Sequence, residues 1–324
     1  MNMIDANSIP CYVHACLNRV LNPPVDVHKY SRGVAQLCAG SPEYAGAALL
    51  CARAAQRAGA GYTQLFTDAP IEPLQVAAPS LVVRSLDAWE IPDHNTCALG
   101  IGSGFLPGDF HTTYRRLFER TQRYPHCVVV DGGALSFLAT EQGKQWAAVR
   151  ARNGFPTIIT PHVGEAARLL ASISDDVSGD MRSNEANKLH VLNAHTSQCP
   201  QSHLSHNPCA RTLEQDAYRL SQYFSCCVCL KSSNTVIAYQ NSIATLTNGG
   251  VELAKAGTGD VLMGIITALC SQQLAPFDAA LSGAYLHALA GKFAAEQGDM
   301  VSVIPEDIIA ALPRVFAYVR SFHE

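Results

Sequence analysis

The sequence predicts an α/β protein with a mostly parallel central sheet that helices cover on both faces. Short apolar runs alternate along the chain with stretches of helical periodicity, which is the pattern of parallel α/β folds. Several of these runs are apolar nearly throughout, as strands buried on both faces are. Polar stretches, several of them rich in glycine, follow a number of the runs, at the strand ends where open α/β sheets bind ligands.

Seven apolar runs are the expected strands, and one stretch is the clearest helix. The helix is expected at 44–59, where small apolar residues accompany Arg53 and Arg57 and where Gly59 is a stop signal. Residues 234–248 hold two β-like runs around a three-residue loop, 240–242, which predicts a hairpin at one edge of the sheet. The expected strands are 34–40, 62–67, 80–85, 97–102, 126–131, 156–160 and 226–231.

The composition fits one large α/β domain or two smaller ones. The 324 residues are 48% hydrophobic and 15% charged, and the net charge of −4 comes with no basic block, so no nucleic-acid partner is expected. The longest apolar runs are about ten residues, too short to span a bilayer. The first residues include Asp5 and lack the basic-then-apolar pattern of a signal peptide. We therefore expect a soluble, cytoplasmic protein.

The twelve cysteines form no regular framework. Cys226, Cys227 and Cys229 lie in a β-like run, where cysteine serves as a small apolar residue. Reduced thiols in the core are the favoured interpretation, with disulfides or a zinc site as the alternatives.

From about 172 to 211 the alternating pattern ends in a segment rich in Ser, Asn, Asp and His. So long a segment without secondary structure is unusual inside a compact domain, which indicates an insertion. Its spacings match no zinc motif, so a solvated loop is favoured over a metal site. The residues considered for the metal site are His190, His195, Cys199, His203, His206 and Cys209.

One stretch combines a glycine-rich turn, a lone acid and a buried helix. Gly257, Thr258 and Gly259 precede Asp260, and an apolar run follows from 261 to 270. A helix N-terminus carries unpaired N–H groups and the positive end of the helix dipole, and glycines let the backbone approach an anion. Asp260 is then either a base that deprotonates a hydroxyl attacking phosphorus or orients a metal, or a first-turn residue stabilised by the dipole.

Other polar stretches follow strand-like runs at 39–48, 100–109, 128–135, 157–170 and 229–238. His162 and Glu165 are three residues apart, which fits an ordinary first-turn contact better than a metal pair. Lys231 ends an apolar run and is either a solvated charge or a phosphate ligand. The shared position of these stretches at strand ends predicts that they meet at one site.

Taken in order, the stretches "HKYSRGVAQLCAGSPEYAGAA", "GIGSG", "VVVDGGAL", "TPHVGEAARLL", "LKSSNTVIA", "AKAGTGDVLMGIITAL" and "AYLHALAG" resemble the ADP/ATP-dependent (S)-NAD(P)H-hydrate dehydratase family. The resemblance covers roughly 26–298 and is interrupted by the insertion. It implies a ribokinase-like fold, with an N-terminal segment at 1–25 and the dehydratase domain at 26–324. Only about 25 residues precede the match, so no upstream epimerase domain is expected in this chain.

Members of that family repair hydrated NADH and NADPH: a nucleotide phosphorylates the ring hydroxyl, and loss of phosphate restores the double bond. The resemblance implies that Asp260 is the base and that Gly257, Thr258 and Gly259 supply the anion hole. It assigns no metal ligand, although Mg²⁺ is the expected ion, ADP or ATP the co-substrate and a homotetramer the expected assembly. The implied nucleotide-binding residues are Lys231, Ser232, Ser233, Asn234, Thr235 and Gly259, and the residues for the hydrated dinucleotide are Ala47, Gly102, Gly104, His162 and Asp260.

The chain departs from the family pattern at several positions. Where members read Asp-Ala-Asp-Ala-Leu, this chain has 131–135 as "DGGAL", so a second acid is missing. The Lys-Gly of the family is Lys231-Ser232, a glycine often found before Gly257 is Ala256, and the early His-Lys-Gly ends in Tyr30. Two alternatives therefore stay open: a vitamin-precursor kinase of the same superfamily, and a nucleotide-binding relative without turnover.

Overall fold

The computed structural model describes residues 2–92, 97–106, 112–174 and 212–321. Helix α7 runs over Val163–Ser174, so the first three residues of the expected insertion are helical. The rest of the insertion, with all six residues considered for a metal site, lies outside the described residues. Among the helices of the described ranges, none is both long and apolar enough to cross a membrane.

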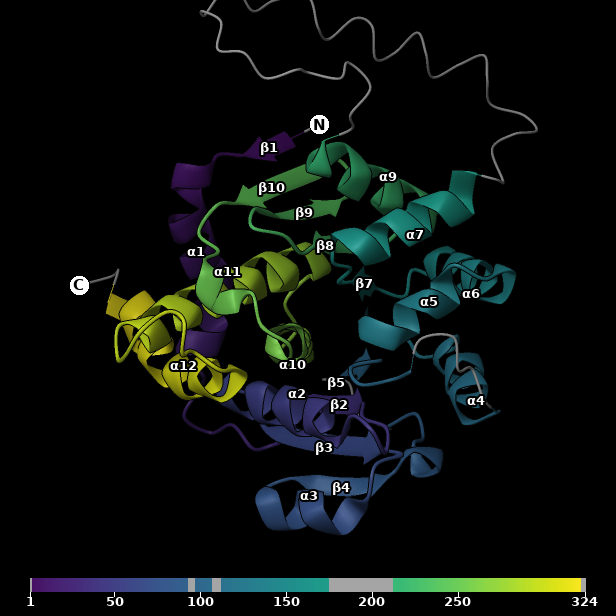
Figure 1. The fold of residues 1–324 in the computed structure, drawn as a ribbon, viewed down its shortest axis with the longest axis horizontal. Helices are drawn as coiled ribbons and strands as arrows, with labels where there is room; N and C mark the ends of the chain where they lie inside the picture. The colour runs from purple at the N-terminus through teal and green to yellow at the C-terminus, as the bar shows by residue number, and fades with distance from the viewer. Residues whose placement is uncertain (1, 93–96, 107–111, 175–211, 322–324) are drawn as a thin grey trace, which may run out of the picture.

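A single sheet of ten strands in the order β1-β10-β9-β8-β7-β6-β5-β2-β3-β4 organises the fold (Figure 1). Every neighbouring pair is parallel except β9, which runs antiparallel to both β8 and β10. The strands are β1 (Asn2–Ile4), β2 (Val34–Cys38), β3 (Tyr62–Thr67), β4 (Val82–Ser85), β5 (Cys97–Ile101), β6 (Cys127–Val130), β7 (Thr157–Ile159), β8 (Cys227–Leu230), β9 (Thr235–Tyr239) and β10 (Ser242–Leu246).

All seven expected strands are confirmed. Asp131, Thr160 and Lys231, at the expected ends of three of them, lie just beyond the observed strands, whereas Thr67 and Ser85 still pair with each other. The hairpin differs from its prediction in two ways. Its turn has two residues, with Gln240 at φ 52°, because Ser242 already pairs with Tyr239. It is also not at the edge, because β1 pairs in parallel with β10 outside it. The short β1 gave no signal as an apolar run.

Helices cover both faces of the sheet, and each face has its own buried cluster. The helix predicted at 44–59 is confirmed as α2. Helix α10 packs against α2 so closely that a Cβ at Gly264 would lie 2.1 Å from the carbonyl oxygen of Cys51. One face carries α1 (Ile9–Leu21), α2 (Ala45–Arg57), α3 (Ile71–Ala77), α10 (Thr258–Ser271), α11 (Pro276–Ala295) and α12 (Pro305–Arg320); the other carries α4 (Thr112–Thr121), α5 (Leu135–Leu138), α6 (Glu141–Arg152), α7 and α9 (Leu213–Phe224).

The ten described cysteines are free thiols, and eight of them are buried. The prediction of reduced core thiols is confirmed for these residues.

Arg150 on α6 is fully buried and satisfies backbone carbonyls near the amino ends of β6 and β7. Its guanidinium donates to Thr157 Oγ1 at 2.9 Å and to four carbonyl oxygens, those of Thr121, Tyr124, His126 and Pro156, at 2.7–2.9 Å. Burial lowers the pKa of Arg150 to about 10, so the side chain stays charged at neutral pH. All five N–H groups of the guanidinium thus have acceptors.

We predict that Arg150→Met lowers the melting temperature by roughly 6 °C or more. The variant leaves buried carbonyl groups without a hydrogen-bond donor, which costs about 1–3 kcal/mol for each group. Arg152→Met on the same helix is the matched control, since Arg152 is exposed and the change should be within about 2 °C. Thermal unfolding of both variants checks this. Equal melting temperatures would contradict the role given to Arg150.

Candidate active site

The carboxyl ends of β5, β6, β7 and β8 bring the predicted polar stretches together. Asp131 follows β6, and Lys231 follows β8. The chain at Lys231 bridges to His162 in parallel fashion, and Lys231 N donates to the carbonyl of Pro161 at 2.8 Å. The predicted convergence of these strand ends is therefore what the structure shows.

An ion pair between Lys231 and Asp131 joins the ends of β8 and β6. Lys231 Nζ lies 2.6 Å from Asp131 Oδ1, and the same oxygen accepts a 2.6 Å hydrogen bond from Thr160 Oγ1. Burial acts to lower the pKa of Lys231, but the charges of Asp131 and Glu165 outweigh it and raise this pKa above its ordinary value. Lys231 is thus a fixed positive charge at every physiological pH.

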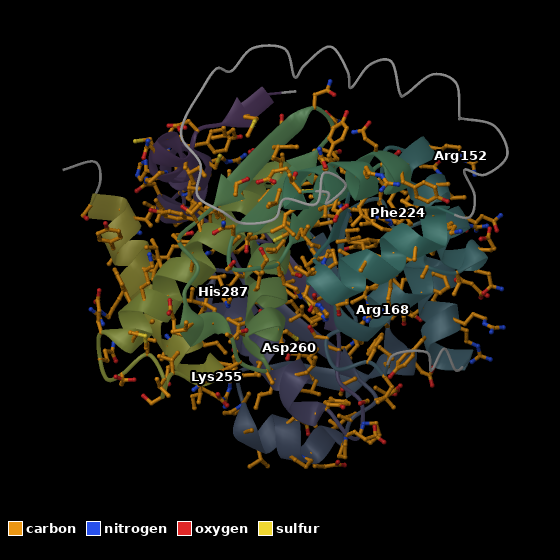
Figure 2. The ribbon with its side chains drawn as sticks, turned by 45° about the horizontal axis from the view of Figure 1, so that its top comes forward. Arg152, Arg168, Phe224, Lys255, Asp260 and His287 are labelled. Atoms are coloured by element: carbon orange, nitrogen blue, oxygen red, sulfur yellow. The ribbon has the colours of Figure 1, made fainter. Side chains whose placement is uncertain are left out.

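Asp260, labelled in Figure 2, lies in the first turn of α10, and the charges of both Asp131 and Lys231 act on its carboxylate. Burial and the negative charge of Asp131 raise the pKa of Asp260 to about 6, against smaller opposing effects of a Ser103 hydrogen bond and of Lys231. A carboxylate with a pKa near neutrality suits a general base. A helix N-terminus by itself favours the ionised form, so the rise comes from burial and from the charge of Asp131.

The turn before Asp260 has the backbone of an anion site. Gly257 adopts φ 94°, and a Cβ there would lie 2.9 Å from Leu50 and Pro305 side-chain atoms. Both the backbone conformation and the lack of space therefore favour glycine. The Thr258 hydroxyl donates to the carbonyls of Leu253 and Lys255 at 2.8 and 2.9 Å. This hydroxyl therefore holds the turn. The N–H groups of Gly259 and Asp260 have no acceptor within the helix, as is usual in a first turn.

A cavity of about 650 Å³ opens beside this turn. A Cβ at Gly259 would lie 3.3 Å from Lys231 Nζ, so the ammonium group and the helix N-terminus point at the same space. The cavity is lined by His162, Lys231, Ser232, Ser233, Thr235, Leu246, 248–251, 253–255, Thr258, Gly259, Leu262, Ala284, His287 and Ala288. All predicted nucleotide-binding residues except Asn234 line it.

Three polar side chains at or beside this cavity have buried atoms without a hydrogen-bond partner among the described residues. These are both amide atoms of Asn248, Oε1 of Glu252 and Nε2 of His287. Burial, followed by the charge of Lys231, lowers the pKa of His287 to about 4, so the ring is neutral. Sequence reasoning missed all three; the signal for His287 was a lone polar ring in the apolar run 284–291.

The residues predicted for the hydrated dinucleotide fall into two places. Ala47 and Gly104 are adjacent, because a Cβ at Gly104 would lie 2.8 Å from Ala47 Cβ, and Gly102 approaches the carbonyl of Asp131. They flank Ser103, the neighbour of Asp131 and Asp260. His162 instead lies on the cavity side of Lys231.

His162 is tied to the start of α7. Its Nδ1 accepts the N–H of Gly164 at 2.9 Å, and its own N–H donates to Glu165 Oε2 at 2.8 Å. The first-turn contact expected for this pair is confirmed, and the side chain remains 56% exposed. Its ring nitrogen Nε2, 3.6 Å from Glu165 Oε1, is the polar atom left for a ligand.

A family model described as NAD(P)H-hydrate dehydratase matches residues 35–314. The chain belongs to the NAD(P)H-hydrate dehydratase family. The resemblance drawn from the motifs is thereby confirmed.

Curated relatives of this chain belong to the same family. The bifunctional NAD(P)H-hydrate repair enzyme Nnr of Escherichia coli K12 is 28% identical over 292 residues, which are 89% of this chain and 48% of that protein. The ADP-dependent (S)-NAD(P)H-hydrate dehydratase of Neisseria meningitidis serogroup B is 29% identical over 89% of this chain and 86% of its own length. This chain thus spans about half the length of the bifunctional relatives.

Solved structures confirm the ribokinase-like fold. An ADP/ATP-dependent NAD(P)H-hydrate dehydratase from Bacillus subtilis, co-crystallised with ATP and Mg²⁺, superposes with a TM-score of 0.69 at 24% identity, covering 96% of this chain and 97% of that one. A ribokinase-like superfamily protein from Enterococcus faecalis gives 0.68 at 19% identity, covering 98% and 96%.

The acid that this member of the dehydratase family lacks has no room in its structure. A Cβ at Gly133 would lie 2.1 Å from the carbonyl oxygen of Phe105, so an aspartate there requires the backbone to move. Gly132 adopts φ 54°, which also favours glycine. The sequence departure is therefore built into the local backbone, and Asp131 alone provides the carboxylate of this turn.

The side chains fit a magnesium ion held mainly by phosphate oxygens. Among the described residues, no group of three or more His, Cys, Asp or Glu side chains is placed to hold a metal ion. Mg²⁺ commonly takes one or two carboxylates, water and the phosphates of a substrate. Asp131 Oδ2 is the less engaged oxygen of its carboxylate, 3.5 Å from Ser103 Oγ, and can supply one such ligand.

We predict that Asp131→Asn lowers the pKa of Asp260 from about 6 by roughly one unit, because it removes a nearby like charge and leaves Lys231 in place. Carboxyl-carbon NMR titration measures this directly, with the Asp260 signal assigned by its loss in Asp260→Asn. Glu141→Gln is the control, since Glu141 is 83% exposed and pairs with Lys144, and it is not among the groups that shift the pKa of Asp260. An unchanged or higher pKa in Asp131→Asn would refute the assigned cause.

Proposed function

We propose that this protein dehydrates hydrated NADH and NADPH in a nucleotide-dependent reaction that restores NADH and NADPH. The observation that carries the proposal is Asp260, a carboxylate with a pKa of about 6 in the first turn of a helix whose first residues, Thr258 and Gly259, line a cavity. A base beside an anion cradle is the arrangement that phosphoryl transfer to a hydroxyl requires.

In this mechanism Asp260 takes the proton of the ring hydroxyl while the hydroxyl oxygen attacks the terminal phosphorus of ADP or ATP. The bond from that phosphorus to the leaving nucleotide breaks, and the backbone N–H groups of Gly259 and Asp260 with Lys231 stabilise the transferred group. The ring carbon then loses phosphate and its neighbour loses a proton, which restores the double bond. Asp131 would help to hold Mg²⁺ together with the phosphates, and the ion would supply charge neutralisation.

The two substrates would approach Asp260 from opposite sides. The cavity lined by Lys231, Ser232, Ser233 and Thr235 fits the nucleotide, because it has a cation and a helix N-terminus at one end. The turn at 102–104 with Ala47 fits the hydrated dinucleotide, because it approaches Asp260 through Ser103. We place Asn234 with the nucleotide group through its loop, where its N–H bonds Ser232 Oγ at 3.2 Å.

We further propose that the protein acts in the cytoplasm, where NADH and NADPH turn over, and that it assembles as a homotetramer. The ribokinase-like domain would comprise 26–324, with 1–25 as an N-terminal segment that adds β1 and α1 to it. An assay of the purified protein with hydrated NADH and either ADP or ATP tests the activity. Phosphorylation of simple alcohols without repair of the hydrated cofactor would indicate a small-molecule kinase instead.

Asp260→Asn should lose turnover by about 10²–10⁴-fold, the usual contribution of a positioned base. Binding of nucleotide and hydrated cofactor should persist, because the amide keeps the shape of the carboxylate. Single-turnover assays and calorimetric titration separate the two effects. A variant with more than half of wild-type turnover would show that Asp260 is structural.

His162→Asn should raise the Michaelis constant for ADP or ATP several-fold, because His162 lines the cavity proposed for the nucleotide and a hydrogen bond to a polar ligand contributes about 0.5–1.5 kcal/mol. The constant for the hydrated cofactor should move less than about two-fold. Asparagine is a good helix N-cap, so this variant keeps the start of α7, while His162→Ala removes both functions. A larger rise for the cofactor than for the nucleotide would place His162 at the hydrated dinucleotide, as the resemblance implies.

A further inference from the structure

Ser103 lies between the two carboxylates of the site. Its side chain is fully buried, and its hydroxyl is 3.5 Å from Asp131 Oδ2 and also forms a hydrogen bond with the Asp260 carboxylate. A serine in a turn commonly bonds a nearby backbone group. Within the described ranges, however, the acceptors of this hydroxyl are the two carboxylates, so it is directed at the acids and not at its own backbone.

The backbone around Ser103 is fixed on both sides. Gly102 adopts φ 113°, and a Cβ there would lie 2.1 Å from the carbonyl oxygen of Asp131. Gly104 adopts φ 72°, and the carbonyl of Ser103 accepts the N–H of Gly40 at 2.8 Å. Both flanking positions favour glycine. These contacts hold the Ser103 hydroxyl next to the acids.

A hydroxyl has one proton to donate, so one carboxylate receives it. Asp131 is already well supplied with donors, because its Oδ1 accepts from Lys231 Nζ and Thr160 Oγ1, each at 2.6 Å. Asp260 has no side-chain donor other than Ser103 among the described residues. Hydrogen bonds to an ionised group are the strong ones, and the carboxylate with fewer donors gains more from this one. Asp260 is therefore the preferred acceptor.

We propose that Ser103 positions Asp260 for proton transfer, an inference that rests on the proposed role of Asp260 as the base. The Ser103 hydroxyl donates to one carboxylate oxygen, which fixes the carboxylate plane and leaves the second oxygen for the hydroxyl of the hydrated ring. In the transfer, the O–H bond of the ring hydroxyl breaks as the second oxygen bonds the proton, and Ser103 keeps its own proton. Ser103 is a positioning residue, because it acts on the reaction through Asp260.

Ser103→Ala should lower kcat by about 10–100-fold, because a base that is no longer held in place loses the geometry that the reaction needs. The Michaelis constants for the nucleotide and the hydrated cofactor should change less than about two-fold, since neither ligand loses a contact. Steady-state and single-turnover assays with hydrated NADH and ADP or ATP measure both effects. A higher Michaelis constant for the hydrated cofactor with an unchanged kcat would overturn the inference, because Ser103 would then only shape the turn at 102–104.

Ser271→Ala is the matched control and should keep the wild-type kcat. Ser271 is also fully buried, and its hydroxyl donates to the carbonyl of Ala268 at 2.8 Å. It lies on the same helix as Asp260, at the opposite end of α10. The control therefore removes a buried, hydrogen-bonded hydroxyl without touching the carboxylates.

The decisive measurement is a double-mutant cycle in which Ser103→Ala is also made in Asp260→Asn. If Ser103 acts through Asp260, the added change lowers the single-turnover rate less than about two-fold, because the group that it positions is already inactive. An equal loss in both backgrounds overturns the inference, since Ser103 then acts independently of Asp260.

Ser103→Thr and Ser103→Val cover the case in which the alanine variant fails to fold. The two side chains have nearly the same shape, but only threonine keeps the hydroxyl, so the threonine variant should react at least about five-fold faster. Equal rates overturn the inference. If wild type repairs hydrated NADH and Ser103→Ala keeps more than half of its kcat, the inference alone is overturned. If wild type does not repair hydrated NADH, the proposed function fails and the inference with it.

Discussion

The ion pair between Lys231 and Asp131 is the interaction on which the site depends. It crosses β7, so it fixes the ends of three neighbouring strands relative to one another. Thr160, at the end of the strand between them, donates to the same carboxylate oxygen. Removing one partner of such a buried pair leaves an unpaired charge and commonly costs about 3–5 kcal/mol. The pair therefore holds Lys231 in the cavity wall in a way that a solvated lysine is not held.

The same pair sets the chemistry of Asp260. Both members act on this carboxylate, but the effect of Asp131 exceeds that of Lys231, and together with burial it raises the pKa of Asp260 to about 6. A lysine without its partner would instead favour the ionised form of Asp260 and lower its pKa. Asp131 thus both positions the ammonium group of Lys231 and raises the pKa of Asp260.

Much of this arrangement could be predicted from the sequence. Strand ends and the glycine turn at 257–259 are local features, so apolar runs and turn chemistry revealed them. The strand β1 could not be found, because three residues gain their conformation from pairing with β10 and not from their own pattern. Nor could the partner of Lys231, because 100 residues separate it from Asp131. Asn248 and His287 escaped for a related reason: a polar side chain without a partner is recognised only when its surroundings are known.

The absent second acid follows from the same physics. Asp131, Glu165 and Asp260 already act on one ammonium group, and burial raises the pKa of both Glu165 and Asp260. Another carboxylate at Gly133 would need a shifted backbone and would add repulsion toward an incoming polyphosphate. With fewer fixed negative charges, Lys231 and the start of α10 leave the cavity wall less repulsive toward phosphates. The loss of this acid is therefore compatible with the proposed phosphoryl transfer.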